Sequence, residues 1–122
     1  MSAVRLFALE RVGTCLVVVL SGEMGSLADS QITAELDHAL GELRKPEVRH
    51  LIVDFAQMPY FGSILLEGIR SLWKEIDARH GNMALCNVSL VGKEILGIAR
   101  FDTLWPIFAT RAEAVRSVED AV

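Results

Sequence analysis

Three short, strongly apolar runs most limit what this chain can fold into. They are Thr14–Leu20 (TCLVVVL), His50–Phe55 (HLIVDF) and Met83–Val88 (MALCNV). Apolar runs of this length are typical of strands that are buried on both faces of a sheet. A weaker alternation in Val4–Leu9 predicts an edge strand that a turn at Gly13 joins to the first run. Leu104–Phe108 predicts a last short strand.

Helical patterns separate these runs. A Ser-x-x-Asp capping box, Ser26–Asp29, predicts the start of a helix whose apolar residues recur at helical spacing as far as Leu43. Arg44 and Lys45 suit the negative end of the helix dipole, and Pro46 prevents the helix from continuing.

Three further helices are predicted after this one. Apolar residues at helical spacing run from Leu65–Ile76, and Gly81 is predicted to end that helix in the left-handed conformation. Leu90–Ala99 predicts a shorter helix. A second capping-box match, Thr110–Glu113, predicts the start of a terminal helix that continues through Val118.

The predicted order is strand, strand, helix, strand, helix, strand, helix, strand, helix. Strands that alternate with helices in this way predict an α/β fold with right-handed crossovers. At 122 residues the chain can bury a core without disulfides or metals. We therefore expect a single domain, residues 1–122, with a mixed, mostly parallel sheet of four to five strands flanked by about four helices.

Composition and charge exclude several classes of function. Apolar residues make up 52% of the chain and charged residues 23%, which favours a globular protein over a disordered one. The net charge is −4 and Lys and Arg form no stripe, so we expect no nucleic-acid partner. The longest apolar run, Cys15–Leu20, is too short to span a bilayer, and no signal peptide is recognisable. We expect a cytoplasmic protein without membrane insertion.

The residue types that most often bind metals have no ligand-like spacing here. Cys15 and Cys86 lie inside strand-like runs, outside any Cys-x-x-Cys motif, and we expect both to be buried free thiols. We expect His38, His50 and His80 to occupy solvated surface positions. The sequence therefore predicts neither a metal nor a cofactor.

Ser63 is the residue on which the functional interpretation depends. It lies in MPYFGSILLEGI (58–69), where a strand-like stretch gives way to a helix. A nucleophilic serine needs a base and a group that orients the base, and this segment does not match the Gly-x-Ser-x-Gly elbow. No Gly-x-x-x-x-Gly-Lys-Ser loop for phosphate is present either. We expect no catalytic residues and a protein that is not an enzyme.

Three segments in register resemble the STAS domains of anti-sigma factor antagonists. The first is the strand 51–55, followed by Met58–Phe61 and by Ser63 at the start of a helix. The second is Gly22-Glu23-Met24, which is similar to the family's Gly-Glu-Leu/Ile-Asp segment. The third is Phe101–Phe108, which is similar to the family's F/L-D-x-L/V-F-x-I/F pattern. The resemblance covers nearly the whole chain and implies a STAS-like fold.

The resemblance also implies a binding switch. In that family the serine that corresponds to Ser63 is phosphorylated by a partner that is both a serine kinase and an anti-sigma factor, and the unphosphorylated form captures this partner. A phosphoryl group adds about −1.5 to −2 charge, which the start of a helix tolerates. Around Ser63 this sequence departs from the family at four positions: Gly62 replaces an Asp, and Ile64, Leu65 and Glu67 replace a small residue and two glycines. Gly25 also replaces the Asp that the family has after Gly22-Glu23-Met24.

Two roles stay open for Ser63, because serine is also a favoured N-cap of helices. The neighbouring apolar residues could form an exposed docking rim or pack into the core. We assign the partner-binding surface to Tyr60, Phe61, Gly62, Ser63, Ile64, Glu67, Glu23 and Met24.

The leading hypothesis is a regulatory protein-binding domain, an anti-sigma factor antagonist that binds a serine-kinase/anti-sigma factor or another signalling protein and is switched by phosphorylation at Ser63. The alternative is a STAS scaffold or accessory subunit, stressosome-like or transporter-associated, that is never phosphorylated. The altered segment Gly62–Glu67 favours this alternative. A sensor of nucleotides or other small ligands rests on analogy of fold alone.

Overall fold

The computed structural model of the protein describes residues 7–21, 29–101 and 103–120. The elements follow the predicted order of strands and helices. They are β1 (Phe7–Val12), β2 (Cys15–Ser21), α1 (Asp29–Leu43), β3 (His50–Gln57), α2 (Ser63–Ala78), β4 (Met83–Cys86), α3 (Leu90–Ile98), β5 (Ile107–Phe108) and α4 (Arg111–Asp120). Residues 4–6 of the predicted first strand and 26–28 of the predicted capping box lie outside the described residues.

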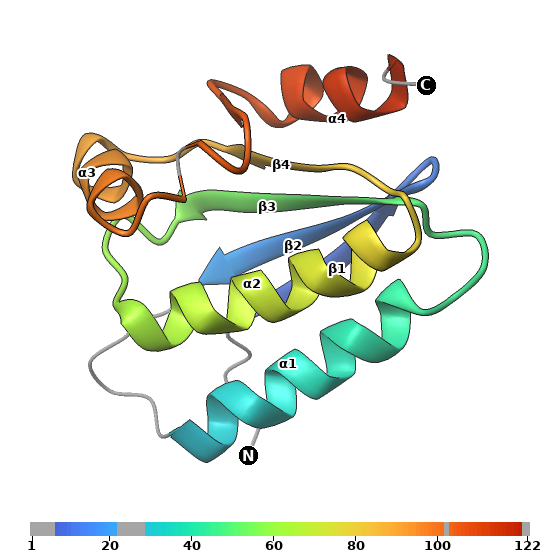
Figure 1. Cartoon of the computed structure of the whole chain (residues 1–122), viewed down its shortest axis with the longest axis horizontal. Helices are drawn as coiled ribbons and strands as arrows, with labels where there is room; N and C mark the ends of the chain where they lie inside the picture. The colour runs from blue at the N-terminus through green and yellow to red at the C-terminus, as the bar shows by residue number, and fades with distance from the viewer. Residues whose placement is uncertain (1–6, 22–28, 102, 121–122) are drawn as a thin grey trace.

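The five strands form one sheet in the order β1-β2-β3-β4-β5. β1 is antiparallel to β2, and every later neighbouring pair is parallel. The α/β fold with a mixed, mostly parallel sheet is therefore confirmed. Helices α1 and α2 cover one face of the sheet, α4 lies on the other, and α3 lies at the end where β3 finishes (Figure 1). None of the helices in the described part of the chain is long and apolar enough to cross a bilayer.

The sheet separates a large core from a smaller one, and β2 contributes to both. Leu16, Val18 and Leu20 belong to the large core beneath α1 and α2, whereas Cys15 and Val17 belong to the core beneath α4. This division follows from the alternation of side chains along a strand. Because residues 15–20 of β2 are buried on both faces of the sheet, their sequence is entirely apolar.

The two cysteines are buried and free, as expected. Burial, with a smaller contribution from Glu119, raises the pKa of Cys15 to about 11. Burial likewise raises the pKa of Cys86 to about 12, and the nearby Asp54 adds to the shift. Both thiols are therefore protonated at neutral pH and behave as small apolar groups of the core.

The end of α2 differs from the prediction for Gly81. His80, not Gly81, adopts the left-handed conformation, with φ of 62°. The N–H of His80 donates to the Asp77 carbonyl (3.0 Å) and the N–H of Gly81 to the Ile76 carbonyl (2.9 Å), which is the Schellman pattern. Gly81 is needed for a different reason: a Cβ there would collide with the backbone carbonyl oxygen of Arg49.

His50 was expected on the surface, and this expectation was wrong. His50 begins β3 and is only 9% exposed, and its Nδ1 accepts a hydrogen bond from the Asn82 N–H (3.1 Å). Burial lowers its pKa, and Arg49 nearby lowers it further. His38 and His80 are exposed, as predicted.

Packing of Trp105 limits the length of β5, and a capping box fixes the start of α4. The strand is shorter than predicted, because Trp105 is buried ahead of it and stacks on Phe101 (centroids 4.8 Å apart). The Thr110 hydroxyl accepts from the Glu113 N–H (3.2 Å), as the predicted capping box requires, and bonds to the Glu113 carboxylate (3.0 Å).

Candidate functional site

The candidate site lies at the edge of the sheet where the parallel strands reach their carboxyl ends. β3 runs toward this edge, and residues 58–62 lead from its end into the first turn of α2, close to α3 (Figure 1). Ligand-binding segments of parallel α/β sheets commonly occupy this edge, because the chain must turn there before each crossover helix. Ser63 is the first helical residue after the turn.

The structure assigns the N-cap of α2 to Gly62, so the interpretation of Ser63 as N-cap is corrected. Gly62 has the extended backbone of an N-cap (φ −114°, ψ −175°), whereas Ser63 is already helical. Glycine has no side chain with which to cap the first turn, and no side-chain hydrogen bond caps this end. The first turn also holds no acidic residue. The N-terminus of α2 therefore presents its N–H groups and positive dipole end to any anion placed on Ser63.

The two aromatic residues before Ser63 have opposite environments. Tyr60 is 68% exposed, whereas Phe61 is 2% exposed and its ring lies 4.9 Å from that of Phe55. Ile64 is 48% exposed. Of the two roles left open for these residues, Phe61 takes core packing, which removes it from the assigned partner-binding surface, while Tyr60 and Ile64 are exposed.

The residues that replace the family's glycines have separate roles. Leu65 is fully buried in the large core, so the extra side chain stabilises α2 against the sheet. Glu67 is exposed one turn after Ser63. A negative charge on Ser63 would therefore face a like charge at the i, i+4 position, which costs about 0.2–0.5 kcal/mol.

Ser89 fixes the position of this loop, although the sequence had not singled it out. It is the N-cap of α3, and its Oγ accepts from the Gly92 N–H (2.9 Å). The same hydroxyl donates to the carbonyl oxygen of Pro59 (2.7 Å). One side chain thus joins the start of α3 to the segment that precedes Ser63. A serine directly before the apolar run 90–92 is a sequence signal for the N-cap of α3. No sequence signal indicates the contact of Ser89 with Pro59, which lies 30 residues earlier.

The buried carboxylate at this end, Asp54, is fully paired. Its Oδ2 accepts from Nε and Nη2 of Arg111 (3.1 Å each), and its Oδ1 accepts from Asn87 Nδ2 (3.0 Å) and the Ala56 N–H (2.9 Å). Arg111 also pairs with Glu10. These contacts tie β3 to α4 and β1, which gives Asp54 a structural task. A buried aspartate in a strand needs a cationic or hydrogen-bonding partner. The sequence pattern did not identify that partner as Arg111, which lies 57 residues away.

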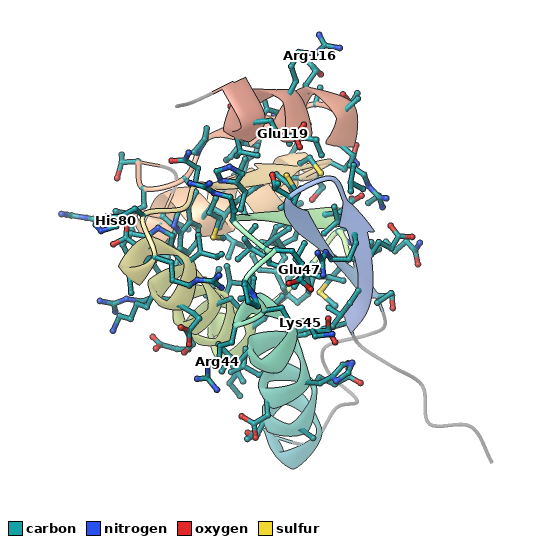
Figure 2. All side chains as sticks on the ribbon, turned by 90° about the vertical axis from the view of Figure 1, so that its right-hand side faces the viewer. Arg44, Lys45, Glu47, His80, Arg116 and Glu119 are labelled. Atoms are coloured by element: carbon teal, nitrogen blue, oxygen red, sulfur yellow. The ribbon has the colours of Figure 1, made fainter. Side chains whose placement is uncertain are left out.

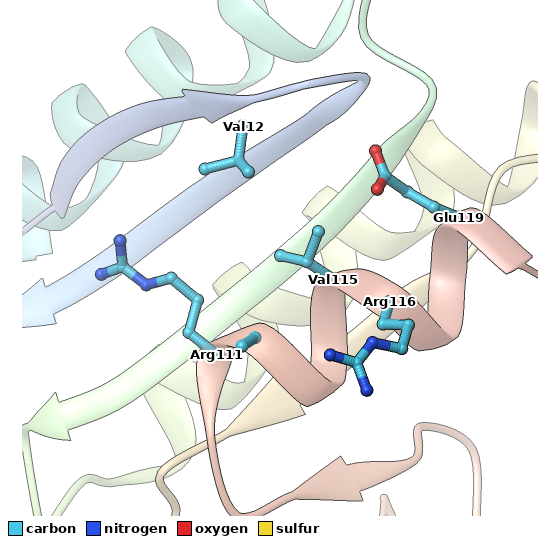
Figure 3. Close-up of a pocket in the computed structure, with 6 residues that line it drawn as sticks. Val12, Arg111, Val115, Arg116 and Glu119 are labelled. Carbon is cyan, nitrogen blue, oxygen red and sulfur yellow. The ribbon is translucent and has the colours of Figure 1, made fainter.

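A cavity on the α4 face lies apart from Ser63. Its volume is about 630 Å³, and Val12, Arg111, Val115, Arg116 and Glu119 line it between the β1–β2 hairpin and α4 (Figure 3). None of the described residues that line it is a serine, cysteine or histidine. Across the described residues, no three His, Cys, Asp or Glu side chains gather where they could hold a metal ion.

The opposite end of the sheet is polar. Arg44, Lys45, Glu47 and His80 lie there at the ends of α1 and α2, and Figure 2 views the molecule from that side. The remaining predicted site residues, Glu23 and Met24, lie outside the described residues.

Comparison with known proteins identifies the family of this α/β domain. The STAS domain family matches residues 7–114, and the chain therefore belongs to that family. An anti-sigma F factor antagonist of Paenibacillus polymyxa is 23% identical over 104 residues, which cover 85% of this chain and 86% of that protein.

Solved structures agree with the fold. An anti-sigma-factor antagonist (STAS) domain protein from Planctomyces limnophilus superposes with a TM-score of 0.81 at 23% identity, covering 93% of this chain and 97% of that one. The anti-sigma factor antagonist SpoIIAA in its unphosphorylated form has a TM-score of 0.75 at 26% identity, covering 95% of this chain and 98% of that one.

Proposed function

We propose that the chain is an anti-sigma factor antagonist that captures a serine-kinase/anti-sigma factor through the surface around Ser63, and that phosphorylation of Ser63 releases this partner. One observation carries the proposal: Ser63 is the first residue of α2, at a helix start without a side-chain cap, and Tyr60 and Ile64, close to it in the sequence, are exposed. The names of similar proteins, an anti-sigma F factor antagonist and SpoIIAA, support the class of partner.

The switch would act on the interface and leave the fold intact. The Ser63 hydroxyl attacks the γ-phosphorus of ATP held by the kinase, ADP leaves, and the hydroxyl proton is lost to solvent or to a base of the kinase. The product carries about −1.5 to −2 charge. The N–H groups and dipole of α2 stabilise that charge within the chain. A partner that packs on Tyr60 and Ile64 would have to bury it, which is costly without a matching cation.

Phosphorylation by the partner is the direct test. The purified chain is incubated with ATP and each serine-kinase/anti-sigma factor of the source organism, and the intact mass and modified peptide are measured. We expect one phosphoryl group on Ser63, and none on Ser63→Ala. Ser71→Ala is the matched control, because Ser71 lies on the same helix and donates its hydroxyl to the Glu67 carbonyl (3.1 Å).

The result that contradicts the switch is specific. If no phosphoryl group is gained and Ser63→Asp binds the partner as tightly as the unmodified chain, Ser63 does not regulate binding. A lost modification in Ser71→Ala would instead place the site elsewhere on α2.

A second candidate is a STAS scaffold or accessory subunit that binds without phosphorylation. Two residues favour it: Gly62 offers no acidic group before Ser63, and exposed Glu67 would repel a phosphate. This candidate predicts stable binding to a signalling or transporter protein, unaffected by ATP or by Ser63→Asp.

A further inference from the structure

Helix α3 is apolar on nearly every side but is buried on only one. Its sequence, LVGKEILGI, contains only two charged residues, and its buried positions are Gly92 and Leu96. Its outer side carries Leu90, Val91 and Ile98, which are 81%, 49% and 86% exposed. A helix that is hydrophobic all round is normally buried. Within the described part of the chain, nothing covers this outer side.

The start of α3 is joined to the segment that precedes Ser63. The Ser89 hydroxyl donates to the carbonyl oxygen of Pro59 (2.7 Å). Tyr60 directly follows Pro59 and Leu90 directly follows Ser89, so the backbones of Tyr60 and Leu90 lie close together. Gly92 permits this approach, because a Cβ there would lie only 3.2 Å from Cε1 of Phe61. Figure 1 places α3 and the first turn of α2 at the same end of the sheet. We call the exposed side chains of Tyr60, Ile64, Leu90, Val91 and Ile98 the apolar ridge.

The chemistry of the ridge fits a protein partner. Lys93 and Glu94, the two charged residues of α3, are both exposed and oppose each other in sign. Nucleic acids and anionic membranes need clustered cations, which this surface does not supply. A stable protein interface buries about 800 Å² on each side, contributed by about 20–30 residues. The few exposed residues around Ser63 cannot provide that area alone, and α3 is the adjoining apolar surface.

We propose that the partner of the Ser63 surface also buries the outer side of α3, with Leu90 and Ile98 as anchors whose contribution does not depend on phosphorylation. This proposal rests on the proposed function, since it concerns the same partner. Leu90 and Ile98 are apolar, and their contribution to binding comes from removing apolar surface from water, which does not depend on charge. A phosphate on Ser63 should therefore weaken the contacts of α2 and leave the contribution of these two anchors unchanged.

A binding experiment in two backgrounds tests this. The purified serine-kinase/anti-sigma factor of the source organism is titrated with the full chain, with the Leu90→Asn/Ile98→Asn double variant and with Leu104→Asn. Each is prepared with Ser63 and with Ser63→Asp. We expect the double variant to raise Kd about tenfold in both backgrounds. Leu104→Asn is the control, because Leu104 is 47% exposed but lies outside the ridge; it should change Kd less than about twofold.

Each contrary result has its own meaning. Failure of the full chain to bind would overturn the proposed function and this inference together. Binding by the full chain that the double variant leaves unchanged would overturn this inference alone. A loss confined to the Ser63 background would overturn the independence from phosphorylation. A dimer of the full chain that the double variant dissociates in sedimentation would assign the ridge to a second copy and overturn the partner assignment.

Discussion

The two ends of the parallel sheet are built by opposite means. At the amino end, the Arg79 guanidinium donates to the carbonyl oxygens of Leu43 and of Lys45 (3.0 Å to the latter), which ties the end of α2 to the end of α1. Arg44 pairs with Glu75 at 2.9 Å between the same helices. The carbonyl groups that a helix end leaves without partners are thus satisfied there by side chains.

At the carboxyl end, the start of α2 has no side-chain cap and apolar side chains face solvent. Gly62 contributes no capping group, and Tyr60, Ile64 and Leu90 are exposed. Optimised polar contacts at one end and uncovered apolar groups at the other indicate different tasks. The polar contacts of the amino end stabilise the fold, and we propose the exposed apolar side chains of the carboxyl end as the surface on which a partner binds.

Gly81→Ala, at the amino end, should produce the largest loss of unfolding stability among the variants that compare the two ends. The added Cβ would collide with the Arg49 carbonyl oxygen, so we expect a loss of about 3 kcal/mol in urea unfolding. Gly62→Ala is the matched change at the carboxyl end, where no atom lies within 4 Å of the added Cβ. It should change stability by less than about 0.5 kcal/mol. Equal losses in both variants would contradict the comparison.

The contacts of Asp54 should stabilise the carboxyl end beneath its exposed surface. Asp54→Ala leaves Arg111 and Asn87 without their buried acceptor, and because Arg111 is partly exposed we expect a loss of about 2–3 kcal/mol. Glu10→Ala removes the exposed partner of the same arginine and should cost about 0.5 kcal/mol. Thermal unfolding of both variants measures the difference, and similar shifts would remove Asp54 from this structural role.

His50 should make the amino end sensitive to pH. Because burial lowers its pKa, the unfolded chain binds a proton more readily than the folded chain. This contribution to stability is complete above the unfolded pKa of about 6.5 and is lost as pH falls toward the folded pKa. We expect the urea midpoint to fall less between about pH 7 and about pH 5 in His50→Gln than in the natural chain.

The smallest effects are expected on the apolar ridge. Ile64→Ala and Leu90→Ala should each change unfolding stability by less than about 0.5 kcal/mol, because both side chains are exposed. Leu65→Ala, one residue from Ile64 but fully buried, should cost about 3 kcal/mol. A large loss from either ridge variant would mean that the ridge supports the fold.

The order of elements could be predicted because its signals are local. The run 15–20 is short and rich in β-branched valine, which favours a buried strand, and helical spacing of apolar residues marks α1 and α2. The ends of elements depend on contacts between distant segments. The requirement for glycine at Gly81 comes from the Arg49 carbonyl across a strand end, which no pattern around position 81 reveals.

The sequence predicted where the candidate site lies along the chain, but not which of its side chains are exposed. The junction before Ser63 is visible as a change from strand to helix pattern. Tyr60 and Phe61 are adjacent aromatics, and only the contact of Phe61 with Phe55 decides which of them is buried. The bond from Ser89 to Pro59 brings α3 to the site, and it depends on tertiary packing.

Hydrogen exchange of the chain with and without the proposed serine-kinase/anti-sigma partner shows which end of the sheet binds it. We expect slower amide exchange in 58–66 and in 89–98 when the unphosphorylated chain is bound, and the exchange in 44–49 and 79–82 is the internal reference. Exchange in these two reference segments at the amino end should be unchanged. Protection confined to the amino end, or to the cavity between the β1–β2 hairpin and α4, would contradict the assignment of the carboxyl end as the partner-binding surface.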